Sequence, residues 1–254
     1  MIIDDNTSIR SLISGGLNPQ NHGRGYRGMW ESDEAKGLAG SFGDIGVPLI
    51  PESDLDDHIR QIELDHATIP ELCDEFRSPV KNQQSTNYCW INAPTRCAEI
   101  IRLRETGEVV SYSPASAGGP IKSFRNVGGW GSQGLRYMRE SGINESTDWP
   151  DNAISRRYYT DENRAKALAN VVLEYYVIET WQEMCSCIVA GIPTANGYSW
   201  WSHEVTGVQL KLKSHDLVID NSWGTGWGDR GRGVLSGRRK IPGDCVAITA
   251  MMPV

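Results

Sequence analysis

Residues 80–90, with the sequence VKNQQSTNYCW, place a cysteine beside a tryptophan after a run of small polar residues. Tryptophan favours a core and polar runs favour the surface, so Cys89 is expected at the boundary between the two. Apolar or small residues then recur near helical spacing as far as Gly107. Pro94 is tolerated only close to a first turn, so the helix should start near Cys89. A cysteine at a helix N-terminus faces unpaired N–H groups and the positive end of the helix dipole, which favour the thiolate.

Thiolate chemistry also needs a base, a group that orients the base and a donor for the oxyanion. Among the five histidines, His203 opens an apolar strand directly after the sequence YSWW. Asn221 is expected to be a buried polar side chain beside Trp223 and Trp227. Taken alone, such a histidine is more often structural and such an asparagine more often serves a turn. Together with Cys89 upstream, they are interpreted as a base and its orienting group.

These motifs resemble, in their order, the motifs of the papain-like cysteine peptidases. Members of that family carry a glutamine, a Cys-Trp pair at a helix start, a histidine that opens a strand, and an asparagine in an N-S-W-G-x-G-W-G run. The chain matches with Gln83, Cys89-Trp90, His203 and residues 221–228. The resemblance covers about residues 78–254 and is densest at these motifs.

The resemblance implies a role for each matching residue. Cys89 would be the nucleophile, and His203 its imidazolium partner and later the acid that protonates the leaving amine. Asn221 would orient the imidazole, while the side chain of Gln83 and the backbone N–H of Cys89 would form the oxyanion hole. Other residues implied at the substrate site are Gly128, Gly129, Trp130 and Trp223. The implied reaction is hydrolysis of a polypeptide through a thioester, without a cofactor or a metal.

Three residues depart from the family pattern. Thr86 stands where the family usually has a disulfide-forming cysteine. Tyr88 is bulky and is expected to narrow access to the nucleophile. Glu204 follows the histidine, where a small residue is common, and it should either stabilise an imidazolium or point to solvent.

The order of the expected elements indicates an α+β protein, because helices come first and strands later. The resemblance implies a papain-like two-lobe fold, with a helical lobe at about 84–165 around the cysteine-bearing helix and an antiparallel β-barrel-like lobe at about 166–254. Residues 1–50 are expected to form an extended glycine-rich arm anchored by Trp30 and Phe42, and residues 51–77 a short helical linker segment. Other expected helices lie within 47–64, capped by Ser53, and at 132–142, 159–170 and 180–191. Expected strands lie at 171–178, 192–201, 203–212, 215–223 and 244–252.

Composition limits the partners of the chain. A net charge of -7 argues against nucleic acid, and no stretch approaches the ~18 apolar residues that span a bilayer. The N-terminus does not have the pattern of a secretory signal. The six cysteines are therefore expected to be free thiols in the cytoplasm or another reducing compartment, with a virus particle as a further location.

Two alternatives to an active cysteine endopeptidase stay open. The chain could be a papain-like structural or interaction module of a larger assembly, such as a viral one, with residues 1–50 contacting other subunits. It could also catalyse a related Cys–His acyl transfer, such as that of a cell-wall amidase or an isopeptidase. Residues 1–77 could instead cross the cleft as a built-in inhibitor.

Overall fold

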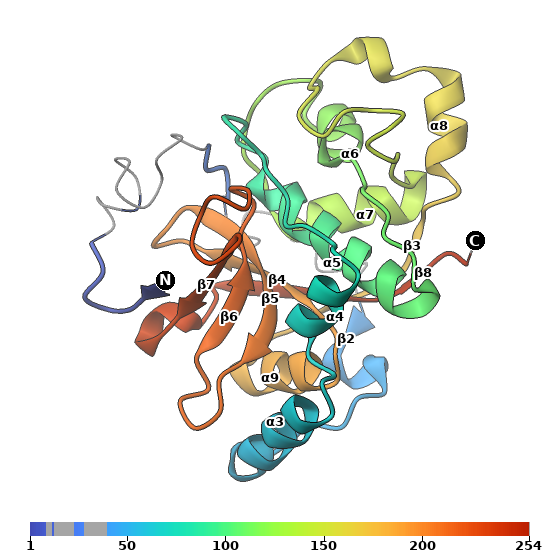
Figure 1. Ribbon diagram of the computed structural model, residues 1–254. Coiled ribbons are helices and arrows are strands. Elements are labelled where there is room, and N and C mark those ends of the chain that lie inside the picture. Colours follow the sequence, from blue (N-terminus) through green and yellow to red (C-terminus); the bar gives the residue numbers. More distant parts are fainter. Residues whose placement is uncertain (9–11, 13–22, 28–39, 254) are drawn as a thin grey trace.

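The computed structural model describes residues 1–8, 12, 23–27 and 40–253, which form a helical lobe and a sheet-containing lobe (Figure 1). The helical lobe gathers around one long helix that also contacts the sheet. Its helices are α5 (Cys89–Thr106), α6 (Pro114–Ile121), α7 (Gly131–Ser141) and α8 (Asp161–Ala167). The interval 89–103 of α5 is buried throughout, as expected for a helix enclosed by packing partners on every side.

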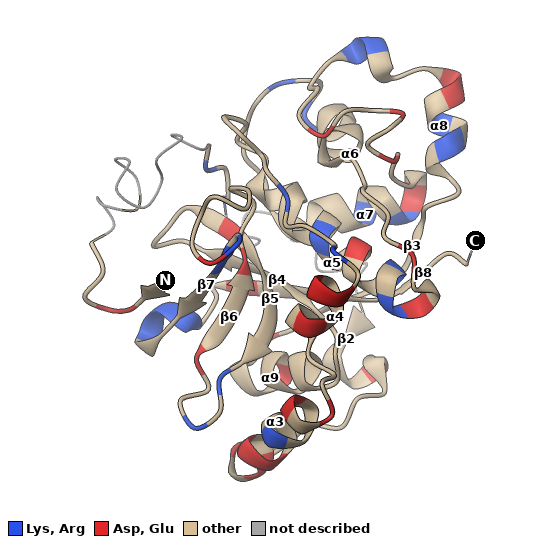
Figure 2. Cartoon of the chain, viewed as in Figure 1, with Lys and Arg blue, Asp and Glu red and all other residues tan. Residues whose placement is uncertain are grey.

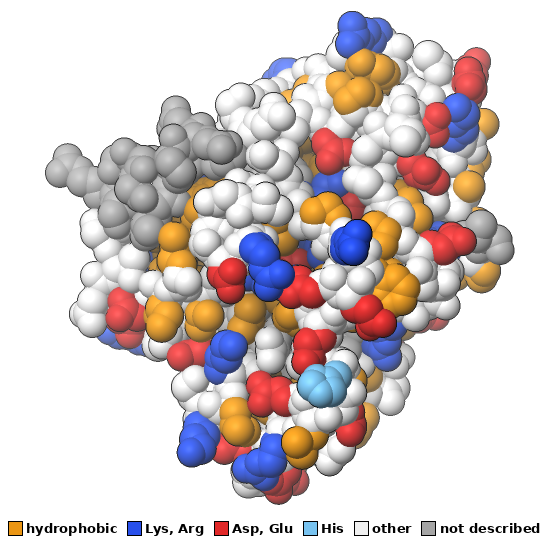
Figure 3. All heavy atoms as spheres, in the orientation of Figure 1, with side chains coloured by type: hydrophobic (Ala, Val, Ile, Leu, Met, Phe, Trp, Pro, Cys, Tyr) orange, Lys and Arg blue, Asp and Glu red, His pale blue; other side chains and the backbone are white. Residues whose placement is uncertain are grey.

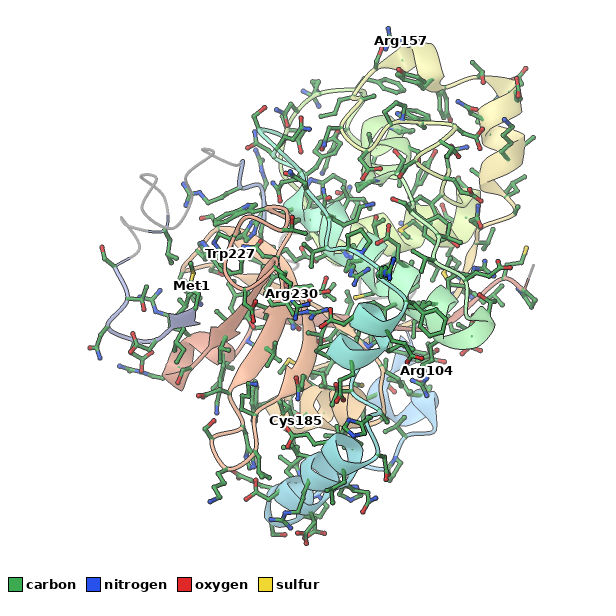
Figure 4. The ribbon with its side chains drawn as sticks, in the orientation of Figure 1. Met1, Arg104, Arg157, Cys185, Trp227 and Arg230 are labelled. Carbon is green, nitrogen blue, oxygen red and sulfur yellow. The ribbon has the colours of Figure 1, made fainter. Side chains whose placement is uncertain are left out.

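The second lobe is built on an eight-stranded sheet in the order β1-β7-β6-β5-β4-β8-β3-β2. From β7 to β3 along this order, each strand is antiparallel to the next. The two edge pairs, β1 with β7 and β2 with β3, are parallel. The strands are β1 (Ile2–Ile3), β2 (Gly40–Ser41), β3 (Val172–Val177), β4 (Thr194–Tyr198), β5 (His203–Leu210), β6 (Leu217–Asp220), β7 (Arg232–Leu235) and β8 (Asp244–Met251). Helix α9 (Trp181–Val189) packs on β4 and β5. Cys185, which is labelled in Figure 4, belongs to this helix.

Short N-terminal elements complete both lobes. Strands β1 and β2 extend the sheet at its two opposite edges, and the short helices α3 (Leu55–Leu64) and α4 (Ile69–Glu75) follow. Phe42 is buried in the main core cluster, whereas Trp30 lies outside the described residues. The prediction that Ser53 caps a helix is wrong, because α3 begins after Asp54 and the Ser53 hydroxyl donates to the Asp54 carboxylate instead.

Charged side chains of both signs are spread over the molecule. Acidic residues gather on α3 and α4 in the ribbon view (Figure 2), while Lys and Arg alternate with Asp and Glu over the face in Figure 3. All six cysteines lie in the described residues and are buried free thiols. Among the described helices, no segment combines the length and the apolar character needed to cross a membrane.

A chain of ion pairs, which is buried at α5 and exposed at its Asp74 end, joins the two lobes. The Arg96 guanidinium on α5 lies 2.9 Å from the Asp220 carboxylate on β6, and both side chains are almost fully buried. Asp220 also pairs with Arg232 on β7 at 3.1 Å, and Arg232 pairs with Asp74 on α4 at 2.8 Å. These contacts tie the cysteine-bearing helix to the strand that ends beside Asn221.

Candidate active site

Cys89 is the first residue of α5 and has no exposed surface. The next residue anchors this helix end, because the Trp90 indole is buried and its Nε1 donates to the Val127 carbonyl at 3.3 Å. The Lys122 ammonium lies 4.8 Å from the centre of the same ring. The prediction of a helix from Cys89 to the glycine at 107 is confirmed, with Gly107 as its left-handed C-cap.

His203 and Asn221 meet where two neighbouring strands of the sheet carry them. His203 is the first residue of β5, and Asn221 follows the last residue of β6. The His203 Nε2 and the Asn221 Oδ1 are 2.8 Å apart, with both residues buried. An amide oxygen only accepts, so Nε2 carries the hydrogen and Nδ1 is the nitrogen on the opposite side of the ring.

Tryptophan rings enclose this pair. The rings of Trp201 and Trp223 lie 4.8 Å and 4.7 Å from the His203 ring, centre to centre. Trp227, labelled in Figure 4, packs edge-on against Trp223 at 5.8 Å. The indoles exclude water from the His203–Asn221 hydrogen bond and so strengthen it.

Gln83 is held by the same loop that carries Asn221. Its Oε1 accepts from the Ser222 hydroxyl at 2.5 Å, and its backbone N–H donates to the Ser222 carbonyl at 2.8 Å. The Gln83 Nε2 donates at 2.7 Å to the Thr86 carbonyl and at 2.8 Å to the Gly23 carbonyl. The second of these acceptors belongs to the N-terminal part of the chain.

Residues 23–27 lie across the cysteine. The Gly25 N–H donates to the Cys89 Sγ at 3.1 Å. The Gly25 carbonyl accepts from the Gly129 N–H at 2.7 Å, and the Arg27 N–H donates to the Gly129 carbonyl at 2.9 Å, so that Tyr26 pairs with Gly129 as in a parallel strand. Segment 23–27 is therefore hydrogen bonded to the Cys89 sulfur and the Gln83 amide, and Gly129 pairs with its backbone.

Glycines make this close approach possible. A Cβ on Gly25 would lie 1.9 Å from the Asn87 carbonyl oxygen, and one on Gly23 would lie 2.0 Å from the Thr86 oxygen. Gly128 faces the segment from the other side, where a Cβ would lie 2.0 Å from the Gly25 oxygen. The Gly-Arg-Gly sequence of residues 23–25 was the signal for this contact, and sequence reasoning did not use it.

The surroundings of Cys89 favour the neutral thiol. Burial and, to a smaller extent, the Glu204 carboxyl raise its pKa to about 12, although hydrogen bonding from the Gly25 N–H opposes both. The sequence-based prediction of a favoured thiolate is therefore wrong for this arrangement, because a desolvated sulfur gains less from the helix end than it loses in hydration.

Glu204 is buried, so the alternative in which it points to solvent is wrong. Its carboxyl accepts from the Gly131 N–H at the start of α7. Burial and the neighbouring Asp244 carboxylate raise the pKa of Glu204 well above its ordinary value. A carboxyl group in this setting stays protonated and neutral over a wider pH range than an exposed one.

Tyr88 turns away from the cysteine, and the prediction that it narrows access to the nucleophile is wrong. Its hydroxyl donates to the carbonyls of Gly118 and Arg125 at 3.2 Å and 3.0 Å, and its ring packs on α6. The side chain fills the core of the helical lobe because its hydroxyl finds two buried acceptors there.

The remaining residues expected at the substrate site lie around segment 23–27 or the histidine. Gly128 and Gly129 contact the segment, and Trp223 covers His203. Trp130 precedes α7 as its N-cap residue, with the Lys122 ammonium 5.0 Å from its ring centre. Tyr26, which is buried on segment 23–27, is a site residue that sequence reasoning missed.

Comparisons with known proteins agree with this architecture. No family model matches the chain. Cathepsin L 1 of Paramecium tetraurelia is 27% identical over 176 residues, which cover 62% of this chain and 55% of the relative. The chain thus spans about half the length of the curated relatives it matches.

Two solved structures share the fold over nearly the whole chain. A digestive procathepsin L 3 of Tenebrio molitor superposes with a TM-score of 0.59 at 15% identity, covering 96% of this chain and 100% of that one. Xylellain, a cysteine protease from Xylella fastidiosa, gives a TM-score of 0.57 at 14% identity, covering 98% and 95%. The prediction of an α+β papain-like fold is confirmed. The curated relatives carry the names cathepsin L and digestive cysteine proteinase, and the solved structures show that the chain has a papain-like fold.

Proposed function

We propose that the chain is a cysteine peptidase that hydrolyses peptide bonds in polypeptides. The observation that carries this proposal is a stretch of the chain's own backbone at the site, with an N–H on the Cys89 sulfur and a carbonyl on the Gln83 amide. A site that holds peptide backbone against a cysteine, beside an oriented histidine, has the parts that acyl transfer requires.

In the proposed mechanism, His203 Nδ1 takes the Cys89 proton, and the thiolate attacks the substrate carbonyl carbon. The oxyanion accepts hydrogen bonds from the Gln83 Nε2 and the Cys89 N–H. The imidazolium then gives its proton to the leaving amine, which departs as the thioester forms. Water, deprotonated by His203, attacks the thioester and releases the acid product and the Cys89 thiol. Asn221 holds the ring through Nε2 in each step.

In this proposal, segment 23–27 blocks the active site of its own chain. The carbonyl on Gln83 belongs to Gly23, whereas the group over the sulfur is the N–H of Gly25. The group that faces the nucleophile is therefore an N–H and not the carbonyl that Gln83 binds. The segment thus lies in a nonproductive register. Its role as an internal inhibitor is favoured over a role in contacting other subunits, because its described backbone groups are engaged within the chain. The Tenebrio protein that shares this fold is a procathepsin, which agrees with an internal inhibitor.

Replacement of the nucleophile tests the function. In the full chain carrying Gly25→Ala to open the site, Cys89→Ala should lower peptide cleavage under reducing conditions by at least about 10³-fold. Cys187→Ala, which removes a buried thiol of α9, should cleave peptides at the parent rate. Cleavage that survives Cys89→Ala, or a Cys89 that no thiol-reactive peptide labels in the opened chain, would refute the proposal.

A further inference from the structure

The Tyr26 side chain fills a pocket in the wall of the sheet-containing lobe, and the mechanism above does not use it. The residue is 6% exposed. Its ring lies where Gly197 of β4 lacks a side chain: a Cβ there would be 2.2 Å and 2.5 Å from the Tyr26 Cε2 and Cζ, and 2.1 Å from the Asp244 Oδ1. Gly197 and Asp244 are directly paired between β4 and β8. The glycine therefore opens the pocket, and the carboxylate lies at the end that receives the phenol.

The polar end of the pocket matches a hydroxyl group. The Tyr26 ring and the Asp244 Oδ1 both lie within 2.5 Å of the point where a Gly197 Cβ would stand, so the carboxylate is within reach of the phenol, and the Ser199 side chain also interacts with the phenol. Burial and the charges of Asp244 and Glu204 raise the pKa of Tyr26, so the phenol keeps its proton and remains a donor.

The backbone beside the pocket is the part that pairs with peptide. The backbones of Tyr26 and Gly129 form a β-bridge. The pocket that holds the Tyr26 side chain is therefore next to the backbone of Gly129, which pairs with peptide. A substrate residue that pairs with Gly129 would bring its side chain to the same wall.

We infer that this pocket selects tyrosine in the substrate, with Gly197 giving the space and Asp244 reading the hydroxyl. This inference rests on the proposed peptidase function. Phenylalanine would fill the same space but leave the Asp244 carboxylate without its donor, which a site built around a hydrogen bond disfavours. Asp244 is only half-buried, so the expected preference for tyrosine over phenylalanine is about tenfold.

The first test needs no turnover. Hydrogen exchange of the Gly25 amide in the full chain reports how often segment 23–27 leaves the site. Tyr26→Phe and Asp244→Ala should each speed this exchange by about tenfold, and the double variant should be no faster than either single one. Asp229→Asn, an exposed carboxylate of the same lobe, should leave the exchange unchanged. Additive effects of the two changes, or no effect of either, would overturn the inference.

The second test measures selection. The full chain carrying Gly25→Ala is given fluorogenic peptides that differ only in having tyrosine, phenylalanine or arginine at each position before the scissile bond. At one position tyrosine should exceed phenylalanine by about tenfold in kcat/KM, and Asp244→Ala should abolish that ratio. Equal rates, or arginine above tyrosine, would overturn the assignment. If no peptide is cleaved although the exchange effects are coupled, the peptidase proposal fails and with it the selection of tyrosine in a substrate, and only the contact of Asp244 with the Tyr26 phenol stands.

Discussion

At the scale of single residues, Glu204 is the least expected group near the proposed nucleophile. Its raised pKa means that the folded chain keeps this proton to a higher pH than the unfolded chain does. The unfolded chain thus binds fewer protons above the ordinary glutamate pKa of about 4.3, so the free energy of unfolding falls as the pH rises through that range.

Glu204→Gln removes this titration while keeping an acceptor for the Gly131 N–H. The variant should match the parent in stability near pH 4 and exceed it by about 1–2 kcal/mol near pH 8. Urea denaturation at the two pH values measures the difference. Glu140→Gln, a change at an exposed ion pair of α7, should show no such divergence. A Glu204→Gln effect of equal size at both pH values would contradict the raised pKa.

Some residues of the candidate site could be predicted from the sequence, and others could not. Cys89 and Asn221 were found because each lies in a short local motif whose spacing carries the information. The burial of Glu204 and the direction of Tyr88 were not found, because both depend on packing against segments distant in sequence. Tyr26 reaches Gly197 and Asp244 across most of the chain, and no local pattern reports such a contact.

At the scale of elements, segment 23–27 is positioned by backbone contact rather than by side-chain anchoring alone. Gly25→Ala should push it away from Cys89, because the added Cβ would meet the Asn87 carbonyl oxygen at 1.9 Å. Labelling of Cys89 by a small thiol reagent should speed up by at least about tenfold. Gly43→Ala is the matched control, since its nearest neighbour would be the Ser41 hydroxyl at 3.8 Å. Equal labelling of parent, variant and control would show that the segment does not limit access.

Elements with a strong local signal were predicted well. The capping box of Thr180 and Glu183 opens α9, the helix at 131–141 buries Leu135 and Met138, and the strand at 172–177 has the expected β-branched and aromatic residues. Strands β1 and β2 escaped prediction because each has two residues, too few for any period, and exists through pairing with a distant edge. Helix α4 was not separated from α3, although Thr68 and Glu71 form a capping box.

At the scale of the whole molecule, the N-terminal region joins the two edges of the sheet. Strand β1 lies at one edge and β2 at the other, and the described residues 23–27 lie between these two strands in the sequence. Segment 23–27 itself lies against Cys89. Pairing at both edges thus restrains the segment from two sides, which raises its effective concentration at the site without any additional contact there.

The ion pairs between α5 and the sheet hold the two halves of the proposed catalytic group in register. Removing one partner of a buried pair leaves the other charge desolvated, which costs about 3–5 kcal/mol. Arg96→Met should lower the free energy of unfolding by that amount, because Asp220 then keeps only Arg232 on the more exposed side. Urea denaturation at neutral pH measures the loss. Arg60→Met, which breaks the exposed pair with Asp57, should cost less than about 0.5 kcal/mol. If the two variants lose stability equally, the buried pairs do not join the lobes energetically, and the alignment of Cys89 with His203 must depend on apolar packing between α5 and β5.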